Sequence, residues 1–163
     1  MSDFIKSLKT LILNNASDKI FSEKLTKIKY TNTPSKQIKY FFTTIDQYYP
    51  WDNPLIEKLK PQKTYTFNFD SIDIEHIYPQ KPKVEISTLN SLCHDIGNLT
   101  ILGPEDNRKR GFSNNPFSNK KSVFKKSSIL ENRKIAEYPE WNKKNLEKRR
   151  RELVKYALKV FSI

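Results

Sequence analysis

The sequence has very little cysteine and no long apolar run. Its single cysteine, Cys93, cannot form an internal disulfide, and it excludes a zinc knuckle built from paired cysteines. No apolar stretch approaches the length of a membrane span, and the N-terminus lacks the basic start, apolar core and small-residue cleavage site of a signal peptide. Neither an internal repeat nor a low-complexity tract is present. These absences favour a cytoplasmic protein with no membrane partner.

The chain is rich enough in bulky side chains to build a core. It has 163 residues, of which 36% are hydrophobic, and it contains 10 Phe, 8 Tyr and 2 Trp. Such a composition excludes wholesale disorder, and the length suits a single domain over residues 1–163. Within it we distinguish a helical N-terminal part (1–50), a central part (65–127) and a C-terminal helix (139–163).

The net charge of +12 is concentrated in one part of the chain. From Arg108 to Ile163 there are 17 Lys and Arg against 5 Asp and Glu, whereas the residues before Arg108 are balanced. A polyanion such as DNA is the natural partner for a surface of this kind. The alternative is a solvated face that only confers solubility.

Hydrophobic periodicity predicts an α+β fold with a small antiparallel sheet. Alternating residues predict strands, and apolar positions three and four apart predict helices. The strong helix signals are caps and prolines at the expected ends. The expected helices are Phe4–Ile12, Phe21–Ile28, Pro34–Tyr48, Ser87–His94, Pro104–Arg110, Lys120–Ser127 and Trp141–Phe161, and the expected strands are Tyr65–Phe69, Ile72–Ile77 and Leu99–Leu102.

A carboxylate and a histidine stand side by side in the first strand of the central part. His76 has the residue type of a general base, because a neutral imidazole is available near pH 7. Glu75 offers a carboxylate oxygen and Asn107 an amide oxygen, which are ligands that Mg²⁺ prefers. Adjacent strand residues point to opposite faces, so Glu75 and His76 can serve one site only at a strand end or distortion. Such a set suits hydrolysis of a phosphodiester.

The order of these residues resembles the HNH, or ββα-metal, nuclease motif. More narrowly, the chain is similar to the HNH-like C-terminal domain of GmrSD-type modification-dependent restriction endonucleases, and the similarity is closest over roughly the last 95 residues. Four segments carry this resemblance: Glu75 to Gln80 (Glu-His-Ile-Tyr-Pro-Gln), Gly97 to Leu102 (Gly-Asn-Leu-Thr-Ile-Leu), Asn114 or Asn115 to Lys120 or Lys121, and Trp141 with Arg149 or Arg150.

The resemblance implies a role for each candidate residue. His76 would be the general base, Asn98 would orient it, Glu75 and Asn107 would hold the metal, and Lys120 or Lys121 would contact a substrate phosphate. The basic residues expected to contact DNA are Arg108, Arg110, Lys121, Arg149 and Arg150. His94 matches no catalytic position and is expected to be structural, and Cys93 is expected to be a small buried residue.

The implied activity is Mg²⁺-dependent cleavage of DNA, with Mn²⁺ as a substitute, in a restriction or anti-phage system. GmrSD-type enzymes carry a nucleotide-hydrolysing domain, so a separate nucleotide-hydrolysing or targeting subunit is an expected partner. Two alternatives remain open. One is an inactive HNH fold that binds nucleic acid or a partner, and the other is an RNase-type toxin.

Overall fold

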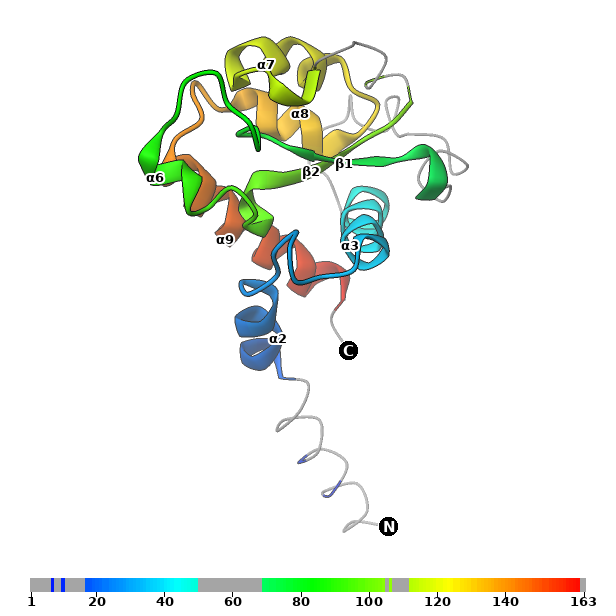
Figure 1. The fold of residues 1–163 in the computed structure, drawn as a ribbon. Helices are drawn as coiled ribbons and strands as arrows, with labels where there is room; N and C mark the ends of the chain where they lie inside the picture. The colour runs from blue at the N-terminus through cyan, green and yellow to red at the C-terminus, as the bar shows by residue number, and fades with distance from the viewer. Residues whose placement is uncertain are drawn as a thin grey trace.

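The structure, a computed structural model, describes residues 7, 10, 17–49, 69–104, 106 and 112–161. The predicted helix Phe4–Ile12 and strand Tyr65–Phe69 fall almost wholly outside these residues, as do Asn107, Arg108 and Arg110. Among the described residues the fold is α+β, with a small sheet embedded in helices (Figure 1), and the predicted fold class is confirmed.

The sheet consists of two antiparallel strands, β1 (Asp73–His76) and β2 (Leu99–Leu102). In their register Asp73 is opposite Leu102 and His76 is opposite Leu99. The predicted strand at Leu99–Leu102 matches β2 at both ends, and β1 is one residue shorter at each end than predicted. All four residues of β2 are buried, because helices cover both of its faces.

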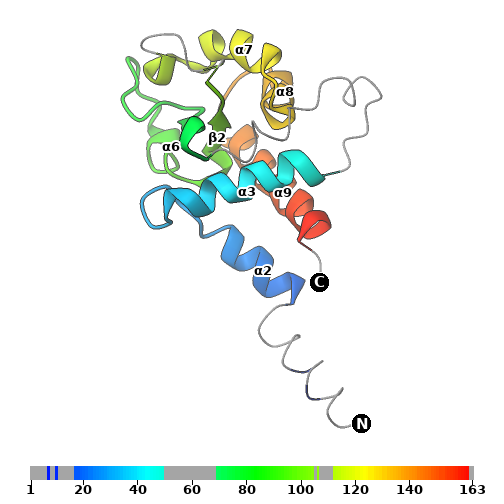
Figure 2. The ribbon, with the colours of Figure 1, turned by 90° about the vertical axis from the view of Figure 1, so that its right-hand side faces the viewer.

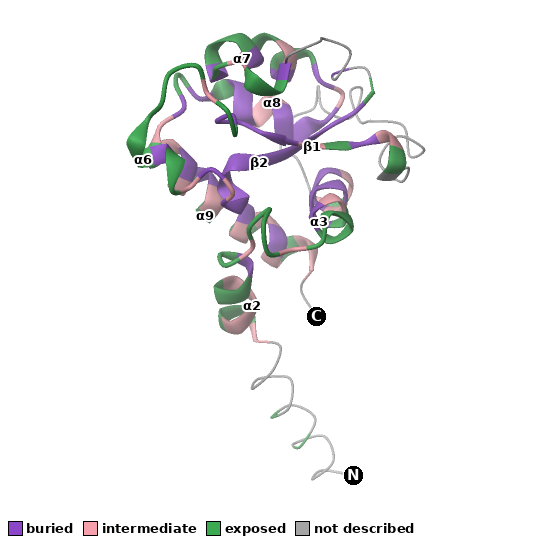
Figure 3. Ribbon diagram, in the orientation of Figure 1, coloured by how far each residue is buried: buried purple, intermediate pink, exposed green. Residues whose placement is uncertain are grey.

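Helices lie on both sides of the sheet (Figures 1 and 2). Helices α7 (Phe117–Lys126) and α8 (Leu130–Glu137) cover one face, and α3 (Ser35–Tyr48) with α9 (Lys143–Val160) covers the other. Alternate residues of β2 follow this division. Leu99 and Ile101 belong to the apolar cluster of α3 and α9, whereas Leu102 packs with α7 and α8. The buried residues form a band through the middle of the molecule (Figure 3).

The two N-terminal helices lie near their predicted positions: the first is three residues earlier at both ends than the predicted Phe21–Ile28, and α3 starts one residue after the predicted Pro34. Helix α2 (Asp18–Leu25) begins after Ser17, whose side chain accepts a hydrogen bond from the Ile20 backbone N–H. Helix α3 begins directly after Pro34, whose fixed φ suits a helix start. Its buried side chains recur every three to four residues: Ile38, Phe41, Phe42 and Ile45.

Several of the later elements differ from prediction in extent. Helix α6 (Ser87–Asn90) covers only the first half of the predicted helix, and α7 starts three residues before its predicted start. Pro104 and Asp106 lie in a turn where a helix was predicted, and helix α8 was not predicted at all. Helix α9 agrees with its prediction to within two residues. Among the described residues, no helix combines the length and apolar character needed to cross a membrane.

Candidate active site

A polar cavity of about 240 Å³ follows the edge of β1 that does not pair with β2. Among the described residues no strand pairs with this edge, so residues from both faces of β1 can reach the cavity, and Glu75 and His76 both line it. His76 is also the last residue of β1, which fits the strand-end position that the sequence required. The remaining lining residues come from three other segments and from the strand itself: Tyr30, Asp73, Ile74, Gln80, Ser113 and Asn114.

The Glu75 carboxylate is held by Lys120, which projects from α7 towards β1. The Lys120 Nζ donates to Glu75 Oε1 at 2.5 Å, to the backbone carbonyl of His76 at 2.6 Å and to that of Ser113 at 2.9 Å. Lys120 is completely buried. Burial raises the pKa of Glu75 and lowers that of Lys120, and the charge of each partner partly offsets the shift in the other.

This arrangement differs from the phosphate contact expected of Lys120. A phosphate cannot reach an ammonium that has no exposed surface and already donates to three acceptors. The structure therefore gives Lys120 a positioning role. It ties α7 to the strand that carries Glu75 and His76, and it fixes the direction of the Glu75 carboxylate.

The His76 ring is buried against three side chains. Its Nε2 lies 3.2 Å from His94 Nδ1 and 3.2 Å from the Gln80 amide nitrogen. The Tyr30 ring meets the His76 ring edge-on at 4.8 Å between centroids. Burial, followed by the charges of His94 and Lys120, lowers the pKa of His76 to about 4. The imidazole is therefore neutral at physiological pH, as a general base must be.

Asn98 uses its whole amide to hold the backbone around the site. Its Oδ1 accepts from the Tyr78 N–H at 2.8 Å and from Trp141 Nε1 at 2.9 Å. Its Nδ2 donates to the carbonyls of Tyr78 at 2.9 Å and Cys93 at 2.7 Å. These bonds join the segment after His76 to the segment before His94. Asn98 thus positions both histidines through the backbone and not through contact with the His76 ring.

Arg149 supports the same region from α9. Its Nη1 donates to the carbonyls of Gly97 at 2.8 Å and Leu99 at 2.7 Å, and its Nη2 lies 2.9 Å from Glu131 Oε1. Arg149 is 1% exposed, so the prediction that it contacts DNA needs correction. Gly97 is required here, because an added Cβ would lie 2.8 Å from the Leu146 carbonyl oxygen.

The other predicted DNA-contact residues are placed differently. Arg150 pairs with Asp95 at 2.6 Å, and its side chain keeps 27% of its surface exposed. Lys121 is half-buried and donates to the Tyr138 carbonyl at 2.8 Å. Neither residue lines the polar cavity.

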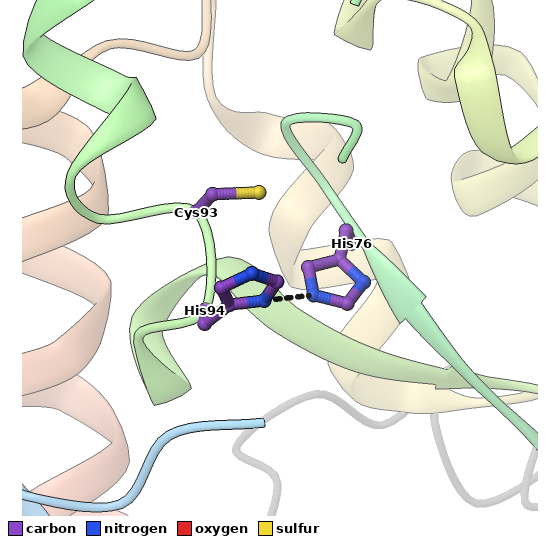
Figure 4. A group of neighbouring side chains, drawn as sticks. All are labelled: His76, Cys93 and His94. Carbon is purple, nitrogen blue, oxygen red and sulfur yellow. Dashed lines mark hydrogen bonds between the residues drawn. The ribbon is translucent and has the colours of Figure 1, made fainter. Parts of the chain in front are cut away.

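His94 contacts the His76 ring at the candidate site, whereas the sequence predicts only a structural role for it. It lies eighteen residues after His76 in a loop, and its only sequence signal is that the chain has no histidine besides these two. Cys93 is buried, as predicted. With His76, Cys93 and His94 form a group whose ligand atoms all lie within 4.8 Å of one another (Figure 4). These residues could hold a metal ion.

Comparison of the chain with known protein families gives a match. A family model described as "GmrSD restriction endonucleases, C-terminal domain" matches residues 15–156. The match includes both strands, the segments that line the cavity and most of α9. No curated protein sequence matches the chain.

Proposed function

Because the chain belongs to the family of GmrSD restriction endonuclease C-terminal domains, we propose that it is a metal-dependent HNH endonuclease that hydrolyses DNA phosphodiester bonds. We place its work in the cytoplasm, in a restriction or anti-phage system. The observation that carries the proposal is a neutral, buried histidine beside a carboxylate in a polar cavity at the sheet edge. A restriction endonuclease needs a base and a metal-binding oxygen in one place.

In this proposal His76 takes the proton from the attacking water. The Gln80 amide nitrogen is a donor only, so the His76 Nε2 that faces it carries a lone pair. The low pKa of His76 keeps the ring unprotonated over the whole physiological range. Lys120 donates to the His76 carbonyl and Asn98 accepts from the Tyr78 N–H, so both residues fix the backbone directly after the base.

Glu75 and Asn107 would hold a Mg²⁺ ion, or Mn²⁺ in its place. The described part of the cavity fits a hard cation, because the carboxylates of Asp73 and Glu75 and the amide of Asn114 all line it. Lys120 donates to Oε1 of Glu75, and the carboxylate has a second oxygen that would be available to a cation. The cation would stabilise the charge that develops on the phosphate.

DNA is the proposed substrate, and the basic C-terminal segment supports this choice. Six cations of α9 are exposed: Lys143, Lys144, Lys148, Arg151, Lys155 and Lys159. Neutralising phosphates with such residues gives affinity without sequence preference. A separate nucleotide-hydrolysing or targeting subunit would then direct the cut, because the family is named for a C-terminal domain of larger enzymes.

Plasmid digestion tests the proposal directly. Supercoiled DNA is incubated with the purified protein in Mg²⁺, in Mn²⁺ and with chelator, beside His76→Ala and Glu75→Gln. We expect metal-dependent nicking that falls by about 100-fold or more in both variants, in His76→Ala because the general base is lost and in Glu75→Gln because a metal-binding carboxylate is lost. Glu85→Gln, which changes an exposed carboxylate outside the cavity, is the control and should cut normally.

The remaining outcomes separate the alternatives. DNA binding with no cleavage under any metal would favour the inactive binding module. Cleavage of RNA but not DNA by the same preparation would favour the RNase-type toxin. Nicking that persists in His76→Ala would remove His76 from the role of base.

A further inference from the structure

Every imidazole and thiol of this chain lies in one place. The sequence contains two histidines and one cysteine, and the fold brings His76, Cys93 and His94 together next to the polar cavity. Cys93 and His94 share a loop, whereas His76 comes from the end of β1 (Figure 4). The chain's nitrogen and sulfur ligands are thus gathered in one group, and one member of it, His76, also lines the polar cavity.

The spacing of the ligand atoms suits a tetrahedral metal. His76 Nε2 and His94 Nδ1 are 3.2 Å apart. Two imidazole nitrogens bound to one Zn²⁺ are about 3.3 Å apart, given a metal–nitrogen distance of about 2.05 Å and tetrahedral angles. The third ligand atom, Cys93 Sγ, lies within 4.8 Å of both nitrogens. The thiol would have to move closer to the two nitrogens for all three ligands to bind one ion.

The backbone fixes these residues before any ion arrives. Asn98 Nδ2 donates to the Cys93 carbonyl, and the Tyr30 N–H donates to the His94 carbonyl at 2.9 Å. Lys29 and Asp95 form a bridge beside them. The Cys93 thiol itself makes only long contacts, 3.7 Å and 3.9 Å, to the carbonyls of Pro79 and Tyr78. Ion binding would therefore replace the side-chain hydrogen bonds of His76 Nε2 to His94 and Gln80 and leave the backbone bonds in place.

We propose that His76, Cys93 and His94 form a zinc site, separate from the Mg²⁺ ligands of the nuclease reaction. Two imidazoles and a thiolate select a borderline-soft cation over the hard Mg²⁺, and three protein ligands leave a fourth position for water. The Cys93 proton is released to solvent when the thiolate binds the ion.

Zinc at this site would switch the nuclease off. Binding occupies the lone pair of His76 Nε2, and the same ring cannot then accept a proton from water. This consequence rests on the proposed function, because it assumes that His76 is the general base. Metal binding itself does not depend on it, so the two statements are tested by different measurements.

Cobalt(II) gives a spectroscopic test of the site in the full chain. Tetrahedral Co²⁺ absorbs strongly in the visible range, and a thiolate ligand adds a charge-transfer band in the near ultraviolet. Since Cys93 is the chain's one cysteine, that band can come only from this site. We expect both signals in the wild type, stoichiometric with protein, and their displacement by Zn²⁺.

Ligand variants decide whether the site is the one proposed. Cys93→Ser should abolish the charge-transfer band, and His94→Ala should weaken Co²⁺ binding by more than about tenfold, the loss seen even for an outer-shell partner. Glu85→Gln should leave both unchanged. A weak octahedral spectrum, or tight binding that survives both ligand variants, would overturn the proposal.

A cleavage assay tests the switch separately. With Mg²⁺ present, micromolar Zn²⁺ should inhibit the wild type and should inhibit Cys93→Ser at least tenfold less. A protein that binds Co²⁺ as described but cuts no DNA would keep the site and refute the function. A protein that cuts DNA and gives no tetrahedral Co²⁺ spectrum would keep the function and refute the site.

Discussion

At the scale of single residues, two buried cations hold the backbone around the candidate site. Lys120 and Arg149 are 0% and 1% exposed, and each donates hydrogen bonds to one carboxylate and two backbone carbonyls. A buried ion pair is costly to form, and removing one partner leaves an uncompensated charge. Both residues therefore act on geometry and stability, although their types and positions resembled nucleic-acid contacts in the sequence.

Replacing Lys120 should separate these roles. In Lys120→Met, Glu75 loses its buried partner, so we expect the free energy of unfolding to fall by about 3 kcal/mol and cleavage to be lost. The salt dependence of DNA binding should not change, because Lys120 is not exposed. Lys125→Met, an exposed change on the same helix, should alter stability by less than about 0.5 kcal/mol.

Denaturant titration and filter binding at several salt concentrations provide the measurements. A reduced salt slope in Lys120→Met, with stability intact, would mean that the ammonium reaches a phosphate as the resemblance implies.

Arg149 and Arg151 make a second matched pair. Arg149→Met removes the partner of Glu131 and the donors to Gly97 and Leu99, so stability should fall by about 3–5 kcal/mol. In a chain of this size that loss lowers Tm by roughly 10 °C. Arg151 is exposed on the same helix, and Arg151→Met should leave Tm nearly unchanged. Differential scanning calorimetry measures both, and equal Tm values would refute the structural role of Arg149.

At the scale of elements, α3 and α8 meet through a buried carboxylate. Asp46 of α3 is 1% exposed, and its Oδ1 accepts the backbone N–H of Glu131 in the first turn of α8 at 3.1 Å. Burial raises the pKa of Asp46 to about 7. The folded state thus holds a proton that the unfolded state releases near pH 4, and this contribution to stability is lost as the pH rises from about 4 to about 7.

Asp46→Asn should remove this pH dependence. The amide oxygen can keep the bond to the Glu131 N–H, and the side chain can no longer ionise. We expect the free energy of unfolding of the variant, relative to that of the wild type, to rise by about 3 kcal/mol from pH 5 to pH 8. Urea titrations across that range measure the difference. A difference between the two proteins that does not vary with pH would show that Asp46 does not titrate as described.

The sequence was most informative where periodicity and burial agree. Strand β2 was predicted closely because it is a short apolar run buried on both faces, and helix α9 because its apolar residues follow the helical period. Helix α8 was missed because polar Glu131 and Asn132 occupy buried positions at its start, which hides the apolar pattern. Their partners, Arg149 and Thr100, lie too far along the chain for local patterns to reveal.

The candidate site, too, could be predicted from the sequence only in part. The motif predicts roles for Glu75, His76 and Asn98 from order and spacing, and the structure brings these three residues close to one another. The motif could not show that Lys120 faces inwards or that His94 meets His76, because both facts depend on how α7 and a distant loop pack against β1. Residue type alone also cannot distinguish an exposed arginine from a buried one, as Arg149 demonstrates.

At the scale of the whole molecule, a four-residue strand is held in place by segments spread along the chain. The His94 carbonyl is bonded by Tyr30, the Glu75 carboxylate by Lys120, Asn98 by Trp141, and the backbone around Asn98 by Arg149. A strand with one neighbour has little stability of its own. The precision of the cavity is therefore a property of the complete fold.

These contacts between distant segments have a consequence for folding during translation. Glu75, His76 and Asn98 are synthesised well before Lys120, Trp141 and Arg149, the residues that lock them into position. A nascent chain that has not yet emerged beyond α9 lacks those contacts, so the residues of the candidate site are not yet held in position. For the nuclease proposed above, cleavage of the host's own DNA would therefore have to wait until α9 has docked.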